Sequence, residues 1–132
     1  MPYDAVITHE EIKKLLGFLP YFQDSNSTFY RVINGYMAES EEVRKFREEL
    51  NQTGFLMVFN WHEWLSDHEE FKDLDNDIHD KIMSSDLDTL RKLMTSYIRG
   101  DRFNEGLFIS AILKGHIRDV LLRLQELKDS HE

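Results

Sequence analysis

The chain has 132 residues, a net charge of −9 at pH 7, no cysteine and 41% hydrophobic residues. The absence of cysteine excludes a disulfide framework, a thiolate zinc site and a cysteine nucleophile, while the apolar content suits a packed core. We expect a single domain over residues 1–132. No apolar run is long enough to cross a bilayer, and residues 1–7 lack the features of a signal peptide, so we expect a cytoplasmic protein without membrane contact.

The first predicted helix begins at a capping box formed by Thr8 and Glu11. Apolar residues follow at helical spacing, and we expect Pro20 to end the helix after Ile12, Leu15, Leu16 and Leu19. Residues 23–38 are loop-rich by composition. Within them, the aromatic and β-branched residues of 29–36 favour a strand, whereas Asn34 and Gly35 indicate a turn, so a short strand pair is left open.

Ser40 is the predicted N-cap of a helix that ends at Gly54 and carries Val43, Phe46, Arg47 and Leu50. Residues 55–59 form a short apolar run that we expect to be buried, but periodicity does not decide whether it is a strand or part of a helix. Asn60 and Glu63 have capping-box spacing, which predicts a short helix with Trp61 and Trp64 on one side.

An acidic segment, 66–77, follows this helix. Residues 73–77 resemble the start of a calcium loop, but Ile78 and Ser84 stand where that loop needs glycine and a bidentate glutamate. We therefore expect no metal there. The segment instead leads into a predicted helix with Ile78, Ile82 and Met83.

Three consecutive helices are predicted for the C-terminal part. The first begins with Ser85 and Asp88 and ends at Gly100; the second has Gly106 inside its pattern and ends at Gly115 as a left-handed C-cap. The apolar stripe of the first helix comprises Leu87, Leu90, Leu93, Met94, Tyr97 and Ile98. That of the second comprises Phe103, Leu107, Ile109, Ile112 and Leu113. The last helix carries Ile117, Val120, Leu121, Leu124 and Leu127 on its stripe. The short connections make these helices neighbours, so the predicted fold class is mainly α, a single-domain helical bundle.

Charge is distributed unevenly along the chain. Residues 62–88 hold ten acidic and two basic residues, a net of −8, whereas residues 91–128 hold eight basic and four acidic residues, a net of +4. We interpret this as an acidic region that packs beside the basic helices and partly neutralises them; a basic face for an anionic ligand is the alternative. An acidic chain repels nucleic acid, so none is expected as a partner.

The C-terminal third resembles an uncharacterised bacterial family of small proteins, known only as a domain of unknown function. The matching strings are Asp88-x-Leu90-Arg91-Lys92-Leu93, Arg99-x-x-Arg102-Phe103-x-Glu105-Gly106, Gly115-x-Ile117 and Leu121-x-Arg123-Leu124. A second signature is Phe59-Asn60-Trp61-x-x-Trp64, where the family carries Asp at position 60, and Phe18-Leu19-Pro20 is a third. Position 107 is Leu here, where the resembling family members often carry His, which puts any chemistry of that His in doubt for this chain. The resemblance implies a helical fold and no particular activity.

The resemblance and the charge pattern together direct attention to residues 99–106. Arg102 and Glu105 have the spacing of an ion pair on one helix, while Arg99 and Arg102 could instead grip an anion at a helix N-terminus. We expect Arg102 to be largely buried, hydrogen-bonded to carbonyls freed at the Gly100 break or to a nearby carboxylate.

Other candidate ligand-binding residues lie outside this segment. Trp61 and Trp64 are expected as core anchors or, alternatively, as a stacking platform. His116 is expected near the first turn of the last helix, where a catalytic base would need a nucleophile that the sequence does not supply. His62, His68 and His79 lack the spacing of a hydrolytic zinc helix, and no nucleophile pattern is present, so no metal, cofactor or catalytic residue is expected.

Two functional hypotheses follow. The first is a non-enzymatic interaction or regulatory domain with residues 99–106 as its working surface, binding a protein partner or forming a homodimer. The second is an enzyme or sensor that binds a small anionic metabolite between Arg99, Arg102, Glu105 and Trp61. A pocket into which both arginines converge favours the second hypothesis, and an exposed surface favours the first.

Overall fold

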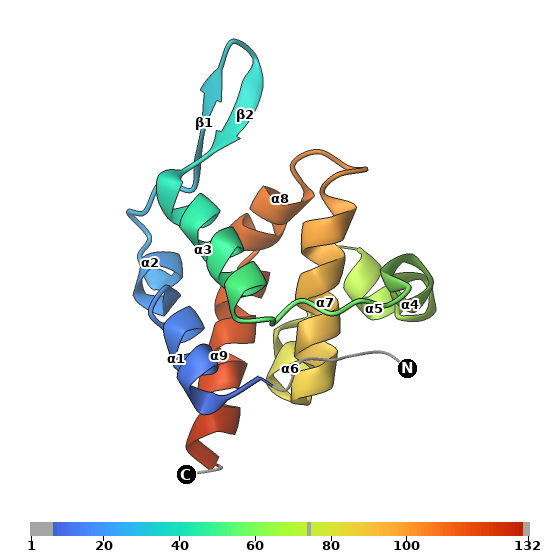
Figure 1. Ribbon diagram of the computed structural model, residues 1–132. Coiled ribbons are helices and arrows are strands. Elements are labelled where there is room, and N and C mark those ends of the chain that lie inside the picture. The colour runs from blue at the N-terminus through green and yellow to red at the C-terminus, as the bar shows by residue number, and fades with distance from the viewer. Residues whose placement is uncertain (1–6, 74, 131–132) are drawn as a thin grey trace.

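The computed structural model describes residues 7–73 and 75–130; residues 1–6, Leu74 of the acidic segment, and residues 131–132 lie outside the described part. The protein is mainly helical, with a two-stranded antiparallel sheet in its N-terminal half and three consecutive helices at its C-terminal end, as predicted (Figure 1). The elements in order are α1 (His9–Leu16), α2 (Leu19–Gln23), β1 (Tyr30–Ile33), β2 (Tyr36–Glu39), α3 (Glu41–Gln52), α4 (Trp61–Asp67), α5 (Glu69–Lys72), α6 (His79–Met83), α7 (Leu87–Gly100), α8 (Leu107–Leu113) and α9 (His116–Ser130).

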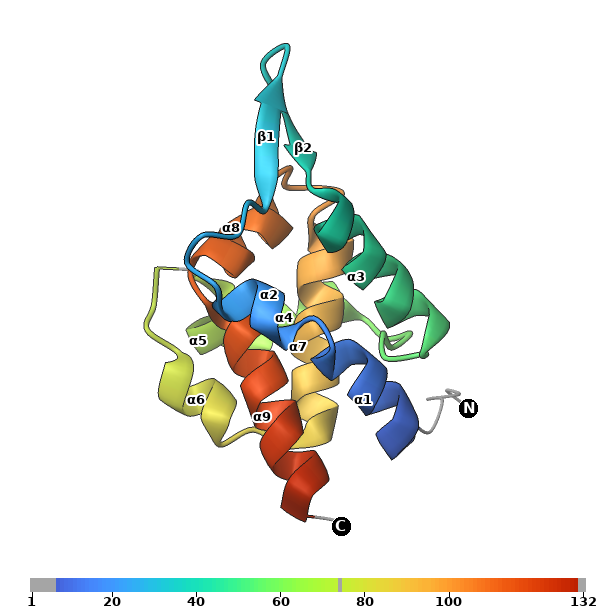
Figure 2. The same ribbon diagram turned by 90° about the vertical axis from the view of Figure 1, so that its left-hand side faces the viewer.

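Helices α7 and α9 form the centre of the molecule. Helix α9 packs against α1, α2, α6, α7 and α8, and α4 packs on α7 (Figures 1 and 2). Leu121 and Leu124 of α9 are completely buried, which confirms their predicted place in the core. Burial of these stripes supplies most of the driving force for folding, since about 25 cal/mol is gained per Å² of apolar surface removed from water.

The N-terminal helices begin where the sequence predicts. Thr8 and Glu11 form the complete capping box of α1, and the Ser40 hydroxyl accepts a hydrogen bond from the Val43 N–H at the start of α3. The predicted end of the first helix was wrong: α1 ends at Leu16, and Pro20 lies in the first turn of α2. Proline is tolerated there because first-turn N–H groups have no intrahelical acceptor.

The strand pair left open by the sequence is a β-hairpin. Asn34 and Gly35 both have positive φ, 50° and 81°, the combination that a two-residue type I′ turn requires. The turn sets the register, with Val32 opposite Met37 and Ile33 opposite Tyr36. The hairpin projects from one end of the helical body, and the C-terminal end of α9 lies at the other end (Figures 1 and 2).

Residues 55–59 form neither a strand nor a helix. Their backbone is instead satisfied by side chains of α7: buried Arg91 donates to the carbonyls of Gly54 and Phe55, both at 2.9 Å, and the Thr95 hydroxyl accepts from the Met57 N–H at 3.0 Å. This explains a buried arginine, because its planar group saturates two carbonyls that would otherwise be orphaned.

The acidic region packs beside the basic C-terminal helices, as the charge pattern predicts. Helix α4, capped by the Asn60 side chain, lies against α7, and α6 lies against α9. Ion pairing between the two regions is sparse; Lys114 and Asp75 meet at 3.0 Å in a solvent-exposed pair. Between α6 and α9, His79 also bonds to Asp119 at 2.9 Å, and both helices bury apolar side chains such as Ile82 and Ile117.

The C-terminal helices require two corrections. The N-cap of α7 is Asp86, not Ser85, because the Asp86 carboxylate accepts from the Thr89 N–H at 2.8 Å. Gly106 is not inside a helix but precedes α8 with a φ of 89°, a left-handed conformation that glycine adopts without strain. Residues 101–106 are therefore a loop. The left-handed φ of Gly115, 84°, confirms the predicted boundary between α8 and α9.

Candidate functional site

The β-hairpin and the loop of residues 101–106 lie at the same end of the molecule (Figure 1). Met37 covers Gly106: a Cβ placed on that glycine would lie 3.8 Å from the methionine sulfur. We call residues 31–37 together with residues 101–106 the hairpin end. It joins the predicted working surface, 99–106, to a segment that is more than sixty residues away along the chain.

Large apolar side chains are exposed at the hairpin end. Val32, Ile33, Tyr36 and Met37 have relative exposures of 65%, 46%, 70% and 39%, and Phe103 has 81%. Directly opposed residues share a face of a hairpin and successive residues alternate. The pairs Val32–Met37 and Ile33–Tyr36 therefore make both faces of the hairpin tip apolar and accessible.

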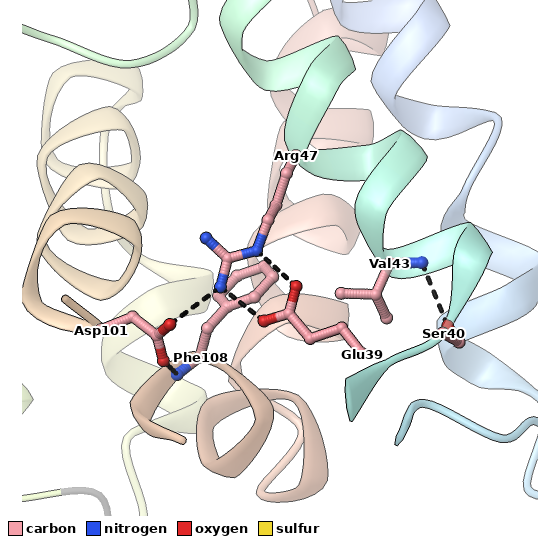
Figure 3. A network of polar contacts seen from close by, with 6 residues as sticks. All are labelled: Glu39, Ser40, Val43, Arg47, Asp101 and Phe108. Carbon is pink, nitrogen blue, oxygen red and sulfur yellow. Dashed lines mark hydrogen bonds and ion pairs between the residues drawn. The ribbon is translucent and has the colours of Figure 1, made fainter. Parts of the chain in front are cut away.

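Arg47 of α3 ties the base of the hairpin to the 101–106 loop (Figure 3). Its guanidinium forks onto Glu39, with Nε 2.7 Å from Oε1 and Nη2 2.5 Å from Oε2, and Nη2 also reaches Asp101 Oδ2 at 3.1 Å. The other Asp101 oxygen accepts from the Phe108 N–H at 3.0 Å, and the Arg47 guanidinium carbon lies 4.6 Å from the Phe108 ring centroid. Planar, bidentate geometry of this kind holds three chain segments in one arrangement.

A groove of about 630 Å³ lies beside this network. It runs between the hairpin, α3 and α8, and it is open to solvent. Its lining residues are Arg31, Ile33, Met37, Ala38, Glu39, Arg44, Arg47, Asp101, Glu105, Gly106 and Ile109. Arg47 is paired with two carboxylates, so the cations in the groove without a side-chain partner among the described residues are Arg31 and Arg44.

The predicted residues of segment 99–106 lie at this end but do not converge. Arg99 is half-buried and Arg102 is exposed, and neither lines the groove. Glu105 is exposed and does line it. The expectation of a buried, hydrogen-bonded Arg102 was wrong, as was its helical ion pair with Glu105: neither side chain has a partner in the described chain, and residues 101–106 are not helical.

The Gly100 break is satisfied without Arg102. The Gly100 carbonyl accepts from the N–H groups of Phe103, at 3.0 Å, and Asn104, at 2.9 Å. Asp101, next in the chain, is held by Arg47 and Phe108. Backbone N–H groups therefore satisfy the Gly100 carbonyl that Arg102 was expected to satisfy, and Arg102 lies exposed at the surface.

The two tryptophans have different surroundings. Trp61 stacks on exposed Phe103 with ring centroids 6.0 Å apart. Its indole also lies close to Gly100 of α7, where a Cβ would be in van der Waals contact with it at 3.6 Å. Trp64 lies in an aromatic cluster, 4.3 Å from the His68 ring and 5.8 Å from Phe71. Trp61 therefore extends the hairpin end, whereas the surroundings of Trp64 are those of a packing residue.

His116 lies apart from the hairpin end, in the first turn of α9. It is 4% exposed, and its Nδ1 lies 2.7 Å from the hydroxyl of buried Tyr97. Burial lowers the pKa of His116 and raises that of Tyr97, so both are neutral near pH 7. Its neighbour in space is His79, whose Nδ1 lies 2.9 Å from a carboxylate oxygen of buried Asp119; this hydrogen bond raises the pKa of His79.

Sequence reasoning missed Arg47 and the hairpin tip. Arg47 was noted only as a member of the α3 pattern, and its partners Glu39 and Asp101 are 8 and 54 residues distant. For the tip, the Asn-Gly turn was a usable signal: it fixes the register, and the register shows that apolar residues occupy both faces.

Within residues 7–73 and 75–130, no group of three or more His, Asp or Glu side chains is placed to hold a metal ion. The described helices include none with the length and apolarity that a membrane span requires.

The fold and the hairpin end define a small, mainly helical protein that presents a β-hairpin. The chain belongs to a family of unknown function, DUF6508, whose model matches residues 7–130. Neither the curated proteins nor the solved structures contain a match to this chain.

Proposed function

We propose that this protein is a non-enzymatic, cytoplasmic interaction or regulatory domain that binds another protein through the hairpin end. The observation that carries the proposal is the exposure of Val32, Ile33, Tyr36 and Met37 on both faces of a projecting hairpin. Phe103, in the loop of residues 101–106, is exposed as well. Contiguous apolar patches on a protein surface mark interaction sites.

The hairpin also has the backbone properties of a docking element. Both outer edges of a two-stranded sheet offer unpaired N–H and C=O groups, and the strands contain neither Lys nor Pro to discourage pairing. A partner strand could add to either edge while its side chains contact the apolar tip. The Arg47 network keeps the hairpin in place for such a partner, because an isolated hairpin is marginally stable in water.

Charge indicates the chemistry of the partner. Four arginines near the hairpin end, Arg31, Arg44, Arg99 and Arg102, have no side-chain partner among the described residues, whereas Arg47 pairs with Glu39 and Asp101 and leaves Glu105 as the unpaired acid of the groove. This contrasts with the net charge of −9 of the whole chain. The best fit is a protein segment with apolar side chains flanked by carboxylates.

The alternative, an enzyme or sensor that binds a small anionic metabolite near Arg99, Arg102, Glu105 and Trp61, has less support. The groove takes in Glu105 but neither of these arginines, and Trp61 is covered on one side by Phe103. Binding of a small anion calls for convergent donors in a concave site.

The proposal is tested by site-specific photo-crosslinking inside the cells that express the protein. A photoreactive residue replaces Tyr36 at the hairpin tip or, as the matched control, exposed Gln125 on α9. We expect a discrete crosslinked protein from position 36 that is absent from position 125. Charge reversal by Arg31→Glu with Arg44→Glu should abolish the crosslink without lowering the melting temperature. Analytical ultracentrifugation of the purified protein shows whether the partner is a second copy. Equal crosslinking from both positions, or a crosslink that survives charge reversal and Val32→Ser, contradicts the proposal.

A further inference from the structure

A second concave site lies at the start of α9, away from the hairpin end. It is a small cavity of about 250 Å³ between α9 and the segment that leads into α6, two elements that lie side by side in Figure 2. Its lining residues are Asp75, Asn76, Asp77, Ile78, His79, Lys114, His116, Arg118 and Asp119. The proposed interaction with a protein does not use this cluster of titratable groups.

His116 offers a hydrogen-bond donor to the cavity. The Tyr97 hydroxyl occupies Nδ1, and Nε2 has no partner in the described chain. Every buried side-chain nitrogen and oxygen of the described residues has a hydrogen-bond partner, so the unpartnered Nε2 is accessible to solvent. His116 lines the cavity, and Nε2 is therefore accessible from there. When protonated Tyr97 donates to Nδ1, the single proton of neutral His116 sits on Nε2 and faces the cavity.

Further donors surround it. The first α-helical hydrogen bond of α9 runs from the Asp119 N–H to the Gly115 carbonyl at 3.0 Å. The N–H groups of residues 116–118 therefore have no intrahelical acceptor. The Arg118 guanidinium lies over Gly115 and uses only Nε on Asp119, at 3.3 Å. Lys114 adds an ammonium at the rim, where its side chain is 51% exposed.

Each carboxylate of the cavity has at least one partner within the protein. Asp119 is held by His79 at 2.9 Å and by Arg118, Asp77 accepts from the His79 N–H at 3.3 Å, and Asp75 pairs with Lys114 at 3.0 Å. The last pair is solvent-exposed and therefore weak, so Lys114 can turn to another anion. Donors without a partner remain on Arg118, His116 and the helix N-terminus.

We propose that this cavity binds the phosphate group of a small ligand, either free phosphate or a phosphomonoester, through Arg118, Lys114, His116 and the N-terminus of α9. Arg118 supplies a planar fork and the helix N-terminus supplies N–H groups and a positive dipole, the two features that recur in phosphate sites. The volume suits a group of this size, since sites for drug-sized ligands begin at about 300 Å³. Asp119 positions Arg118 and His79 and does not contact the ligand.

The test is a titration of the intact protein with sodium phosphate at constant pH and ionic strength, followed through the histidine ring resonances by NMR. His79 and His116 report on the cavity, while His9 and His62 are exposed internal controls on other elements. We expect saturable shifts of His79 and His116 alone. Arg118→Gln should weaken binding about tenfold or more, as expected for loss of a charge-assisted contact.

Two further variants complete the design. Lys114→Gln should also weaken binding. The Lys114 side chain is exposed, so this variant should fold, and it tests the proposal even where Arg118→Gln does not fold. Lys13→Gln, the same charge change on α1 outside the cavity, should leave binding unchanged. Glycerol phosphate in place of phosphate separates the ligands: equal affinity supports a phosphomonoester, and binding of phosphate alone supports the free ion. Absent shifts, shifts shared with His9 and His62, or binding unaffected by Arg118→Gln and Lys114→Gln overturn the inference.

Discussion

Removal of Arg47 should destabilise the protein and loosen the hairpin. The side chains of Arg47, Glu39 and Asp101 are 23%, 19% and 21% exposed, so the network is mostly but not fully withdrawn from water. Arg47→Ala leaves Glu39 without its partner, and Asp101 retains only the Phe108 N–H. Breaking a fully buried pair by removing one member costs about 3–5 kcal/mol.

Partial exposure reduces that figure, because water can solvate the carboxylates that remain. The cation–π contact with Phe108 adds about 0.5–1 kcal/mol to the loss at a site of this kind. We expect Arg47→Ala to lower the free energy of unfolding by about 2–4 kcal/mol. Arg47→Lys should cost about half as much, since lysine keeps the charge but not the planar fork.

Urea unfolding, followed by circular dichroism, measures both variants, and unchanged m-values validate the comparison. Amide hydrogen exchange provides the functional readout, because protection at β1 and β2 should fall in Arg47→Ala while protection in α9 is retained. A double-mutant cycle with Asp101→Asn isolates the coupling between the two segments. A loss below about 0.5 kcal/mol, the value typical of surface pairs, refutes the reasoning.

Four further outcomes are expected. Leu121→Ala should cost about 2–5 kcal/mol in denaturant unfolding, because it opens a cavity at a completely buried position; a loss below about 0.5 kcal/mol contradicts this. Gly115→Ala should cost on the order of 1 kcal/mol or more, since φ is 84° and the new Cβ would lie 2.6 Å from the Arg118 guanidinium; an unchanged midpoint argues against it. Arg102→Lys and Arg102→Ala should melt like the wild type, and a lower melting temperature would revive a structural role. His79→Gln should destabilise more at about pH 5.5 than at about pH 8. The hydrogen bond to Asp119 raises the folded pKa of His79, so its stabilisation is complete below the unfolded pKa and is lost as pH rises through the folded pKa; equal losses at both pH values would refute this.

The sequence by itself determined the features that rest on neighbours along the chain. The capping box of Thr8 and Glu11 and the Ser40 cap join groups three residues apart. The left-handed Gly115 follows from the end of one apolar stripe and the start of another. Apolar periodicity likewise placed Leu121 and Leu124 in the core, since a helix buries one face whatever its partner.

Local rules failed where two of them compete within a few residues. Pro20 can end a helix or lie in its first turn, and only the packing of α2 on α9 selected the second. Ser85 and Asp86 are both acceptable N-caps; the Ser85 hydroxyl donates to the Lys81 carbonyl at 2.8 Å, and the Asp86 carboxylate caps the helix. Gly106 matched a helical stripe that includes Phe103, but the chain turns there with a left-handed φ, and the Asp101 carboxylate accepts from the Phe108 N–H of α8.

Only the tertiary structure decided the candidate sites. Arg47 joins residues from three segments, and no periodicity in α3 distinguishes it from a solvated arginine. Arg102 was expected to be buried because the chain break exposes carbonyls, but the Gly100 carbonyl accepts from backbone N–H groups of the following turn instead. His116 and His79 are brought together by the packing of α6 on α9. Side-chain contacts between distant segments depend on how the apolar faces pack, and that information is carried by the whole chain and not by any one stretch of it.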